Sequence, residues 1–338
     1  MQPVTIKTLA KELKVSVATV SKAFKDSHEI STATKRRVMD LAQRLDYVPN
    51  PYAGSLRKRK SKTLAVVLPE VADSFFSLAI NGIEAVAGEK GYHVLVYLTH
   101  ESFEKEKAVL KDLQSGRVDG VLMSVTTETA NSGHIQALQN TGMPVVFFDR
   151  ICGDVATAKI TTNDVEAASA ATEHLIERGC ERICLLSVSD SLSITHSRTE
   201  GFLQALKKAH RKVAASDIWL CANDAEKAHA LIKKKLANHH RPDGIVATVE
   251  KLIAPVYTAC ADAGLSIPDD VKVVGFSNLP TAAILNPSLT TVTQPAFAMG
   301  KAAAGVLLKA LTKSVQNLER ESAVINSVLE VRGSTMAK

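Results

Sequence analysis

From residue 63 onward, short β-branched runs alternate with segments of helical spacing, and this alternation constrains the fold more than any other feature. The runs form two series of four, at 63–69, 93–98, 118–125 and 144–149, and at 182–188, 218–221, 243–248 and 272–276. The helical segments lie at about 75–90, 102–116, 130–141, 164–178, 195–210, 224–237 and 250–263. Strands that alternate with helices form parallel sheets covered by helices on both faces. The pattern therefore predicts two doubly wound α/β lobes, with a ligand site at the carboxyl ends of their strands.

The first 24 residues have a different pattern, which predicts two short helices joined by a tight turn. Lys14 and Val15 make the turn, and Ser16 stands where the second helix needs an N-cap. The residues that form the apolar faces at helical spacing are Ile6, Leu9, Ala10, Leu13, Val20 and Ala23. The second helix presents a mixed face outward, made of Val17, Ala18, Thr19, Ser21 and Lys22. This face suits a DNA major groove, although an ordinary helical hairpin would show the same two helices.

Charge and a third helix favour the DNA interpretation. Residues 1–62 carry 14 Lys and Arg against five Asp and Glu, a net charge of +9, whereas the whole chain carries +6. The basic excess therefore lies entirely in the first fifth of the chain, which is typical of a phosphate-binding domain fused to a near-neutral body. The third helix begins after a cap at Ser31 and runs to about Leu45, and its apolar face closes a small three-helix core.

The order VTI…LA…VSVATVSKAF…YVPNPYAGSLR, followed by the α/β body, resembles the LacI/GalR family of transcription regulators over essentially the whole chain. The resemblance implies an all-α helix-turn-helix head at 1–49 and a hinge helix with linker at 50–62. It also implies a periplasmic-binding-protein-like body at 63–335, made of two doubly wound parallel-sheet lobes, for ligand binding and dimerisation.

Within that body, the resemblance implies a chain that crosses between the lobes. The first lobe is expected at about 63–161 and 293–321, and the second at about 162–292 and 322–335. The segments expected to cross back between the lobes are 289–295, a helix at 296–312 and one closing strand near 322–332.

The function that the resemblance implies is a ligand-responsive transcription regulator, most often a repressor, that binds a pseudo-palindromic operator in double-stranded DNA as a homodimer. In the family, a hinge leucine wedges into the minor groove, and Leu56 occupies that position, although an ordinary linker leucine would pack on its neighbours. The expected DNA-binding residues are Thr5, Ser16, Val17, Ala18, Thr19, Ser21, Lys22, Ser31, Asn50, Ala53, Leu56 and Lys58.

Two residues of the head depart from the family pattern. Lys14 stands where the turn commonly has glycine, so a left-handed backbone there would cost on the order of 1 kcal/mol. Lys22 stands where arginine is usual, and lysine lacks the fixed fork that binds guanine with two hydrogen bonds.

For the cleft between the lobes, the resemblance implies a small-molecule effector that is a sugar or another polar metabolite. The expected effector-binding residues are Ser74, Phe75, Phe148, Asp149, Asp164, Arg198, Glu250 and Asn278. Arg198 matches the family arginine that holds effector hydroxyls or a carboxylate, the alternative being a solvated arginine near a helix start. Asp149 binds the effector or caps a neighbouring helix.

The cleft also departs from the usual sugar-binding pattern. Val249-Glu250 replaces an Asn-Asp pair, Asn278 replaces an aspartate, and the Asp-Asn order at the crossover is reversed to Asn163-Asp164. The position of the aromatic residue that often stacks on a sugar holds Ala222 or Asn223, while Trp219 is expected in a strand core. These departures weaken a pyranose effector.

Other functional classes lack their sequence signals. There is no phosphate-binding loop, dinucleotide fingerprint or serine-hydrolase motif, so we expect no enzyme and no cofactor. The five cysteines are scattered, which favours buried thiols over a metal site. No signal peptide or membrane-spanning run is present, so we expect a cytoplasmic protein at the nucleoid. The alternative function is a soluble metabolite receptor without specific DNA binding.

Overall fold

The computed structural model describes residues 4–47, 61–212, 214–312 and 317–336, and the chain divides into two compact units, Met1–Ser61 and Lys62–Lys338. The first unit is a bundle of three helices, α1 (Ile6–Leu13), α2 (Val17–Phe24) and α3 (Thr32–Arg44). Leu9, Val20 and Val38, one from each helix, are fully buried at its centre. The predicted three-helix head is therefore confirmed.

Side-chain hydroxyls cap all three helices of this unit. The hydroxyls of Thr5, Ser16 and Ser31 accept hydrogen bonds from backbone N–H groups three residues later, at 3.3, 3.0 and 3.3 Å. Between α1 and α2, Lys14 has a left-handed backbone with φ 55° and ψ 41°. The turn therefore adopts the conformation that favours glycine at the position where this chain has lysine.

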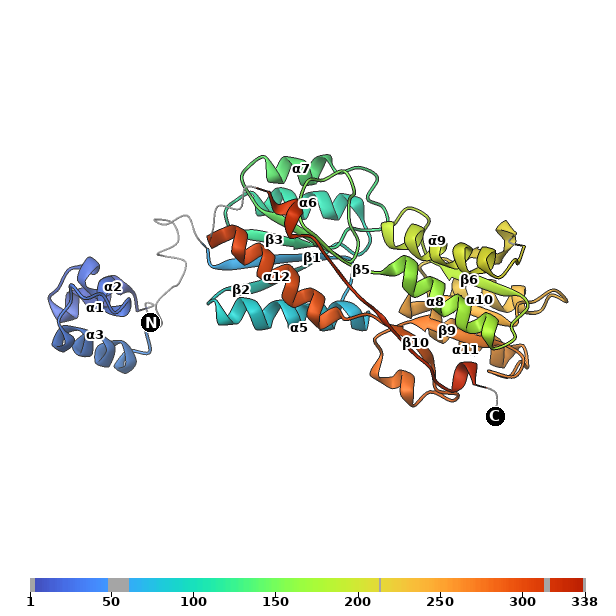
Figure 1. Ribbon diagram of the computed structural model, residues 1–338. Helices are drawn as coiled ribbons and strands as arrows, with labels where there is room; N and C mark the ends of the chain where they lie inside the picture. Colours follow the sequence, from blue (N-terminus) through green and yellow to red (C-terminus); the bar gives the residue numbers. More distant parts are fainter. Residues whose placement is uncertain (1–3, 48–60, 213, 313–316, 337–338) are drawn as a thin grey trace. The chain divides into compact units, whose positions relative to one another are not determined.

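The second unit contains two six-stranded sheets (Figure 1). The first sheet has the order β11-β5-β4-β3-β1-β2, and all its pairings are parallel. Its strands are β1 (Thr63–Leu68), β2 (His93–Leu98), β3 (Gly120–Met123), β4 (Val145–Phe148), β5 (Lys159–Thr162) and β11 (Ala323–Ile325). Its helices are α5 (Ser74–Glu89), α6 (Phe103–Leu113), α7 (Gly133–Gln139) and α12 (Ala296–Thr312).

The second sheet has the order β12-β10-β9-β8-β6-β7, and only β12 runs antiparallel to its neighbour. Its strands are β6 (Ile183–Ser187), β7 (Ile218–Leu220), β8 (Gly244–Ala247), β9 (Lys272–Phe276), β10 (Thr290–Thr293) and β12 (Val328–Glu330). Its helices are α8 (Asp164–Glu177), α9 (Ser193–Lys208), α10 (Ala225–Leu236) and α11 (Ile253–Asp262). The two α/β lobes predicted from the alternating pattern are confirmed.

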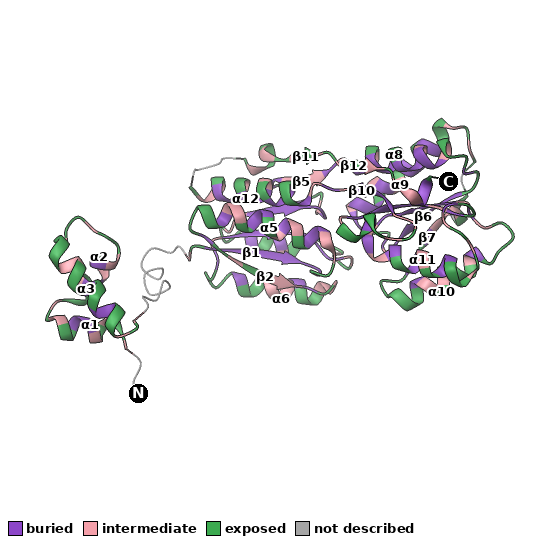
Figure 2. Cartoon of the chain, turned by 90° about the horizontal axis from the view of Figure 1, so that it is seen from below, coloured by how far each residue is buried: buried purple, intermediate pink, exposed green. Residues whose placement is uncertain are grey.

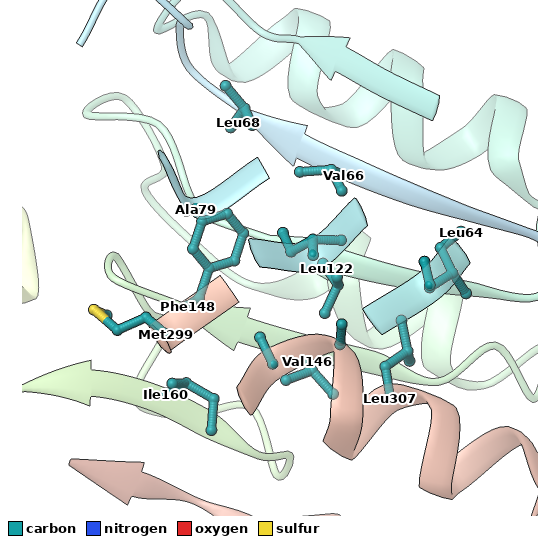
Figure 3. Close-up of a cluster of buried hydrophobic side chains, with 14 of the residues drawn as sticks. Leu64, Val66, Leu68, Ala79, Leu122, Val146, Phe148, Ile160, Met299 and Leu307 are labelled. Atoms are coloured by element: carbon teal, nitrogen blue, oxygen red, sulfur yellow. The ribbon is translucent and has the colours of Figure 1, made fainter. Parts of the chain in front are cut away.

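The central strands of both sheets are buried between partly exposed helices, whereas the edge strands β2, β11 and β12 are half-buried or exposed (Figure 2). In the first lobe, α5 and α12 pack on the same face of the sheet, although 206 residues separate their last and first residues. A Cβ at Gly82 would lie 2.1 Å from the carbonyl oxygen of Phe297, and one at Gly300 would lie 2.0 Å from that of Ala79. Glycine at both positions therefore allows the two helices to approach closely. Figure 3 shows the core beneath them.

The closing segment differs from the prediction. One strand near 322–332 was expected, whereas the structure has two short strands that belong to different sheets. Since β11 pairs with β5, residues 323–325 belong to the first lobe and not to the second. A strand at 159–162 was also missed, because only two of its four residues are buried and its sequence KITT has little apolar content.

Three segments cross between the lobes, and polar side chains hold them together. The first leads from β5 to α8, the second from β10 to α12, and the third from β11 to β12 (Figure 1). The side-chain oxygen of Asn163 in the first accepts a hydrogen bond from the backbone N–H of Ser327 in the third, at 2.7 Å. Asn163 therefore ties two crossings that are distant in sequence.

Candidate functional site

The outward face of α2 carries the side chains expected to contact DNA. Val17, Ala18 and Lys22 are exposed, Thr19 and Ser21 are half-buried, and Val20 and Ala23 are buried between them. The ammonium group of Lys22 is paired with the carboxylate of Glu29, and both side chains are about half exposed. The face is therefore available to a partner, with its one lysine held by an acidic neighbour.

Thr5, Ser16 and Ser31 are exposed at the N-termini of the three helices that they cap. Free backbone N–H groups at such termini bind anions. The remaining expected DNA-binding residues, Asn50, Ala53, Leu56 and Lys58, lie outside the described residues.

Glu250 connects the two lobes at the cleft. It lies three residues after the end of β8 of the second lobe, at the start of a 3₁₀ turn, and is 8 % exposed. Its carboxylate accepts hydrogen bonds from the backbone N–H and the hydroxyl of Ser74, which begins α5 in the first lobe. It also accepts from the hydroxyl of Ser277 at 2.8 Å and from the N–H of Asn278 at 3.0 Å. Protein donors thus occupy the carboxylate that the sequence assigned to the effector.

Arg198 lies in the first turns of α9 and is 2 % exposed, which excludes a solvated arginine. Its Nε donates to Asp164 at 2.7 Å, its Nη1 donates to the carbonyl oxygen of Thr248, and its guanidinium lies 4.1 Å from the ring centre of Phe276. Its Nη2 is buried without a hydrogen-bond partner. Asp164 therefore orients Arg198 and leaves one donor unused.

Two carboxyl groups, of the buried Asp149 and the half-buried Asp73, lie on the first-lobe side of the cleft. Asp149 follows β4, is 6 % exposed and caps none of the described helices. Burial raises its pKa to about 6 against the opposing effect of Arg150 and Arg198. Asp73 caps α5 by accepting from the N–H of Phe75 at 2.9 Å, and burial followed by the charge of Glu250 raises its pKa to about 6 as well.

Arg150 adds a second guanidinium to the first-lobe side. It is 3 % exposed, and its Nη1 donates to Glu101 at 2.9 Å. Its Nε is buried without a hydrogen-bond partner and lies 3.9 Å from the nearer carboxylate oxygen of Asp149, beyond hydrogen-bond distance.

These groups surround a cavity of about 20 Å³ between the lobes. Five of the expected effector-binding residues meet there or at its wall: Phe75, Asp149, Arg198, Glu250 and Asn278. Two others reach it indirectly, because Ser74 bonds to Glu250 and Asp164 bonds to Arg198.

Phe148 is the exception, and its expected place in the cleft is wrong. Its ring is fully buried in the core of the first lobe (Figure 3). The ring of Phe76 lies 6.4 Å from it, between ring centres. As the last residue of β4 it points to the face that α5 and α12 cover. The cavity-lining carboxyl that sequence reasoning missed is that of Asp73, which the helix-capping pattern before Ser74 would have revealed.

Further contacts hold the two lobes together. Leu192 and Ile194 of the second lobe are buried in an apolar cluster of the first lobe. The hydroxyl of Ser191 donates to the carbonyl oxygen of Thr127 at 2.8 Å, and Lys251 is paired with Glu70. The cleft is therefore closed around its small cavity.

A larger hollow of about 680 Å³ lies beside the cavity. Ala222 and Asn223 line it, at the position where a stacking aromatic residue was sought. Trp219 is 6 % exposed and buried within the second-lobe core, as expected. The indole therefore takes no part in either hollow.

Four of the five cysteines are buried as expected, whereas Cys152 is half-buried. Cys180, Cys184, Cys221 and Cys260 are buried free thiols, and burial raises the pKa of Cys180 to about 12. Within the described ranges, no group of three or more His, Cys, Asp or Glu residues is placed to hold a metal ion. No described helix is long and apolar enough to cross a membrane.

Comparison with known proteins covers both units. Residues 61–328 match the model described as periplasmic binding proteins and sugar binding domain of the LacI family, and residues 5–50 match that of bacterial regulatory proteins of the lacI family. The chain is 30% identical over 311 residues to the ribose operon repressor of Halalkalibacterium halodurans. The matched region covers 91% of each chain. It is 27% identical over 333 residues to the HTH-type transcriptional repressor CytR of Escherichia coli K12. That matched region covers 98% of this chain and 96% of the relative.

Solved structures share the fold. The lac repressor dimer bound to operator and the anti-inducer ONPF has a TM-score of 0.87 at 21% identity, over 99% of this chain and 100% of that one. A LacI family transcriptional regulator from Enterococcus faecium with bound ribose has a TM-score of 0.71 at 24% identity, over 80% of this chain and 98% of that one.

Proposed function

The chain belongs to the LacI family of bacterial regulatory proteins, and we propose that it is a repressor whose operator binding responds to a small molecule in the interlobe cleft. As a member of this family, it is a DNA-binding transcription regulator with an effector-binding domain. Its domains are a head at 1–49, a hinge and linker at 50–62, and a body at 63–335. The observation that carries the effector site is the cavity lined by Asp149, Arg198 and Asn278 from two lobes.

In this function, the outward residues of α2 read base edges. Val17, Ala18 and Lys22 are exposed on the face opposite the core, which is the geometry by which a recognition helix enters the major groove. Thr5, Ser16 and Ser31 lie at helix N-termini, where they and the adjacent N–H groups contact phosphates. Asn50, Ala53, Leu56 and Lys58 act in the hinge, with Leu56 as the wedge.

One helix-turn-helix head contacts only one half-site of an operator, so binding to a complete operator needs a homodimer. Two exposed apolar features support a second copy as the partner of the body. Leu95 and Val96 are each 40 % exposed on β2, an edge strand of the first sheet, and Ile284 is 80 % exposed in the second lobe. A second copy that covers the β2 edge and the segment around Ile284 would remove these apolar side chains from water.

The proteins that share both domains are transcription regulators, so we propose no catalytic role. Because the proposed target is operator DNA, the protein acts in the cytoplasm, at the nucleoid. The decisive experiment is selection of bound sequences from a pool of random duplexes, followed by sedimentation of the complex.

A repressor of this kind selects a pseudo-palindrome with half-site centres one helical turn apart, about 10 bp, and binds it as a dimer. If no preferred sequence is recovered, the repressor function is wrong. The function would then be that of a metabolite receptor without specific DNA binding. Within the selected operator, Leu56→Ala is expected to weaken specific binding about tenfold or more and to spare random DNA. Equal losses on both DNAs would make Leu56 a packing residue of the linker.

A further inference from the structure

The outer edge of β7 is free to pair with another strand. β7 is the last strand of the second sheet, and among the described strands only β6 pairs with it. The backbone N–H of Cys221 donates to the carbonyl oxygen of Ser187 at the end of β6, at 2.7 Å. Because successive residues of a strand turn their backbone groups to opposite sides, Trp219 also faces β6. The N–H and C=O groups of Ile218 and Leu220 therefore point away from the sheet.

This edge lacks most of the features that keep natural edge strands from pairing. Such strands usually carry a lysine, a proline or a bulge, or another element covers them. The sequence of β7 is Ile-Trp-Leu, and the side chain of Leu220 is 53 % exposed. The strand has only three residues, which limits the number of hydrogen bonds that it can form. A partner of this edge therefore needs further contacts beside the strand.

The neighbouring helix α9 provides such contacts. A hollow of about 540 Å³ lies between α9 and β7, and its apolar wall is made of Leu203, Ile218 and Leu220. The side chain of Leu203 is 36 % exposed. Residues of α9 that are three or four positions apart form one stripe along this hollow. Besides Leu203, the stripe contains His196, Thr199, Glu200, Gln204 and Lys207.

The charges of this stripe are complementary to those of a second copy. Glu200 and Lys207 are exposed and lie on either side of Leu203, three positions before it and four positions after it. Within the described ranges neither side chain forms an ion pair, and Glu200 accepts only from Gln204 of the same helix, at 2.9 Å. When two copies of α9 pack antiparallel about a two-fold axis beside Leu203, Glu200 of each copy faces Lys207 of the other. The stripe is therefore suited to an isologous interface.

The same kind of two-fold axis suits the strand. Antiparallel pairing centred on Trp219 places Ile218 of one copy opposite Leu220 of the other. These are the residues whose backbone groups point outward, so each of the two pairs can exchange two hydrogen bonds. The exposed side chains of Leu203 and Leu220 are then removed from water.

We propose that the edge of β7 and the outer stripe of α9 form a second self-association surface, which joins two homodimers into a tetramer. The homodimer proposed above uses β2, an edge of the other sheet, and the segment around Ile284, so it leaves β7 free. A tetramer presents four heads and can hold two operators at once. This consequence rests on the proposed function, whereas the surface itself does not.

Sedimentation of the full chain over a range of concentrations tests the surface. A strand of three residues and one helix stripe make a small interface, and small interfaces are transient. We therefore expect the mass to rise from dimer to tetramer between roughly 1 and 100 µM. A wild type that stays a dimer at the upper concentration overturns the proposal. A wild type that rises from monomer to dimer, with β7 variants that stay monomeric, supports this surface and defeats the operator-binding dimer instead.

Substitutions of Leu220 separate the contribution of the strand from general effects. Leu220→Pro removes an outward N–H and keeps the N–H groups that bond to β6, so the fold is retained. Leu220→Lys replaces the apolar contact with a charge that blocks edge pairing. Each should raise the dissociation constant of the tetramer about tenfold or more. The control is Val331→Lys, an exposed valine directly after β12 at the opposite edge of the same sheet. Equal masses for Leu220→Lys and Val331→Lys would overturn the assignment.

Exchange of the two charges tests the two-fold arrangement. Glu200→Lys and Lys207→Glu each place like charges opposite one another, and each should raise the dissociation constant roughly two- to tenfold. The double substitution makes the facing charges opposite again, so it should return the constant to that of the wild type. A double variant that associates more weakly than either single variant would overturn the proposed packing of α9.

Discussion

The hydroxyl and backbone N–H of Ser74 both donate to the carboxylate of Glu250, across the cleft and 176 positions along the chain. Since Ser277 and Asn278 donate to the same carboxylate, Glu250 has its acceptor sites filled by the protein itself. The closed arrangement of the two lobes is therefore stabilised without a ligand.

Replacing Ser74 should loosen this closure. Ser74→Ala removes one donor to a buried carboxylate, which weakens the closed form by about 1–3 kcal/mol. We expect a larger radius of gyration or a longer distance between labels placed on the two lobes. Ser77→Ala is the control, because the hydroxyl of Ser77 bonds only within α5, to the carbonyl oxygen of Ser74. Identical distances in wild type and Ser74→Ala would contradict the role of this contact.

Local pattern predicted most of the fold, and contacts distant in sequence account for what it missed. The strand runs and the caps at Ser16 and Ser31 follow from neighbours within a few residues, and the structure has them as predicted. The saturation of Glu250 depends on Ser74, and no spacing rule connects the two. The split of the closing segment between β11 and β12 likewise depends on which sheet each strand meets.

The buried carboxyl of Asp149 should lower stability as the pH rises. Its pKa in the folded protein is about 6, above the ordinary value of 3.8, so the folded form binds more protons between these values. Stability therefore falls as the pH rises from about 4 to 6, by up to roughly 1–3 kcal/mol from this group.

Thermal unfolding of Asp149→Asn against wild type measures this effect. The variant should be the more stable protein at neutral pH, and the difference should shrink toward pH 4. Asp269→Asn should show no such trend. A variant less stable than wild type at neutral pH would mean that the Asp149 carboxylate is favourably paired.

The left-handed backbone at Lys14 gives a prediction for the head. Lys14→Gly relieves the strain at φ 55° and should stabilise the head by up to about 1 kcal/mol. Lys11→Gly, one turn earlier within α1, should instead destabilise it by a similar amount, since glycine weakens a helix interior. Thermal melts of the full chain, with fluorescence probes on the head, compare the two. The same sign for both substitutions would contradict this interpretation.

Lys22 should contribute to sequence-specific binding in particular. Lys22→Ala removes the one cation on the exposed face of α2 and should cost about 1–3 kcal/mol on the selected operator, with a small loss on random DNA. Lys234→Ala, an exposed lysine on α10, serves as the control. Gel-shift titrations at fixed salt measure both. If Lys22→Ala weakens both DNAs equally, the lysine contacts phosphate and reads no base.

The most direct measurement is operator affinity with and without the effector, for wild type and Arg198→Lys. Lysine keeps the charge beside Asp164 but lacks the second Nη donor that Arg198 leaves free in the cavity. The predicted result is equal operator affinity for both proteins without effector, together with an effector response that is strong in wild type and lost in the variant. An undiminished response in Arg198→Lys would contradict the placement of the effector between the two lobes.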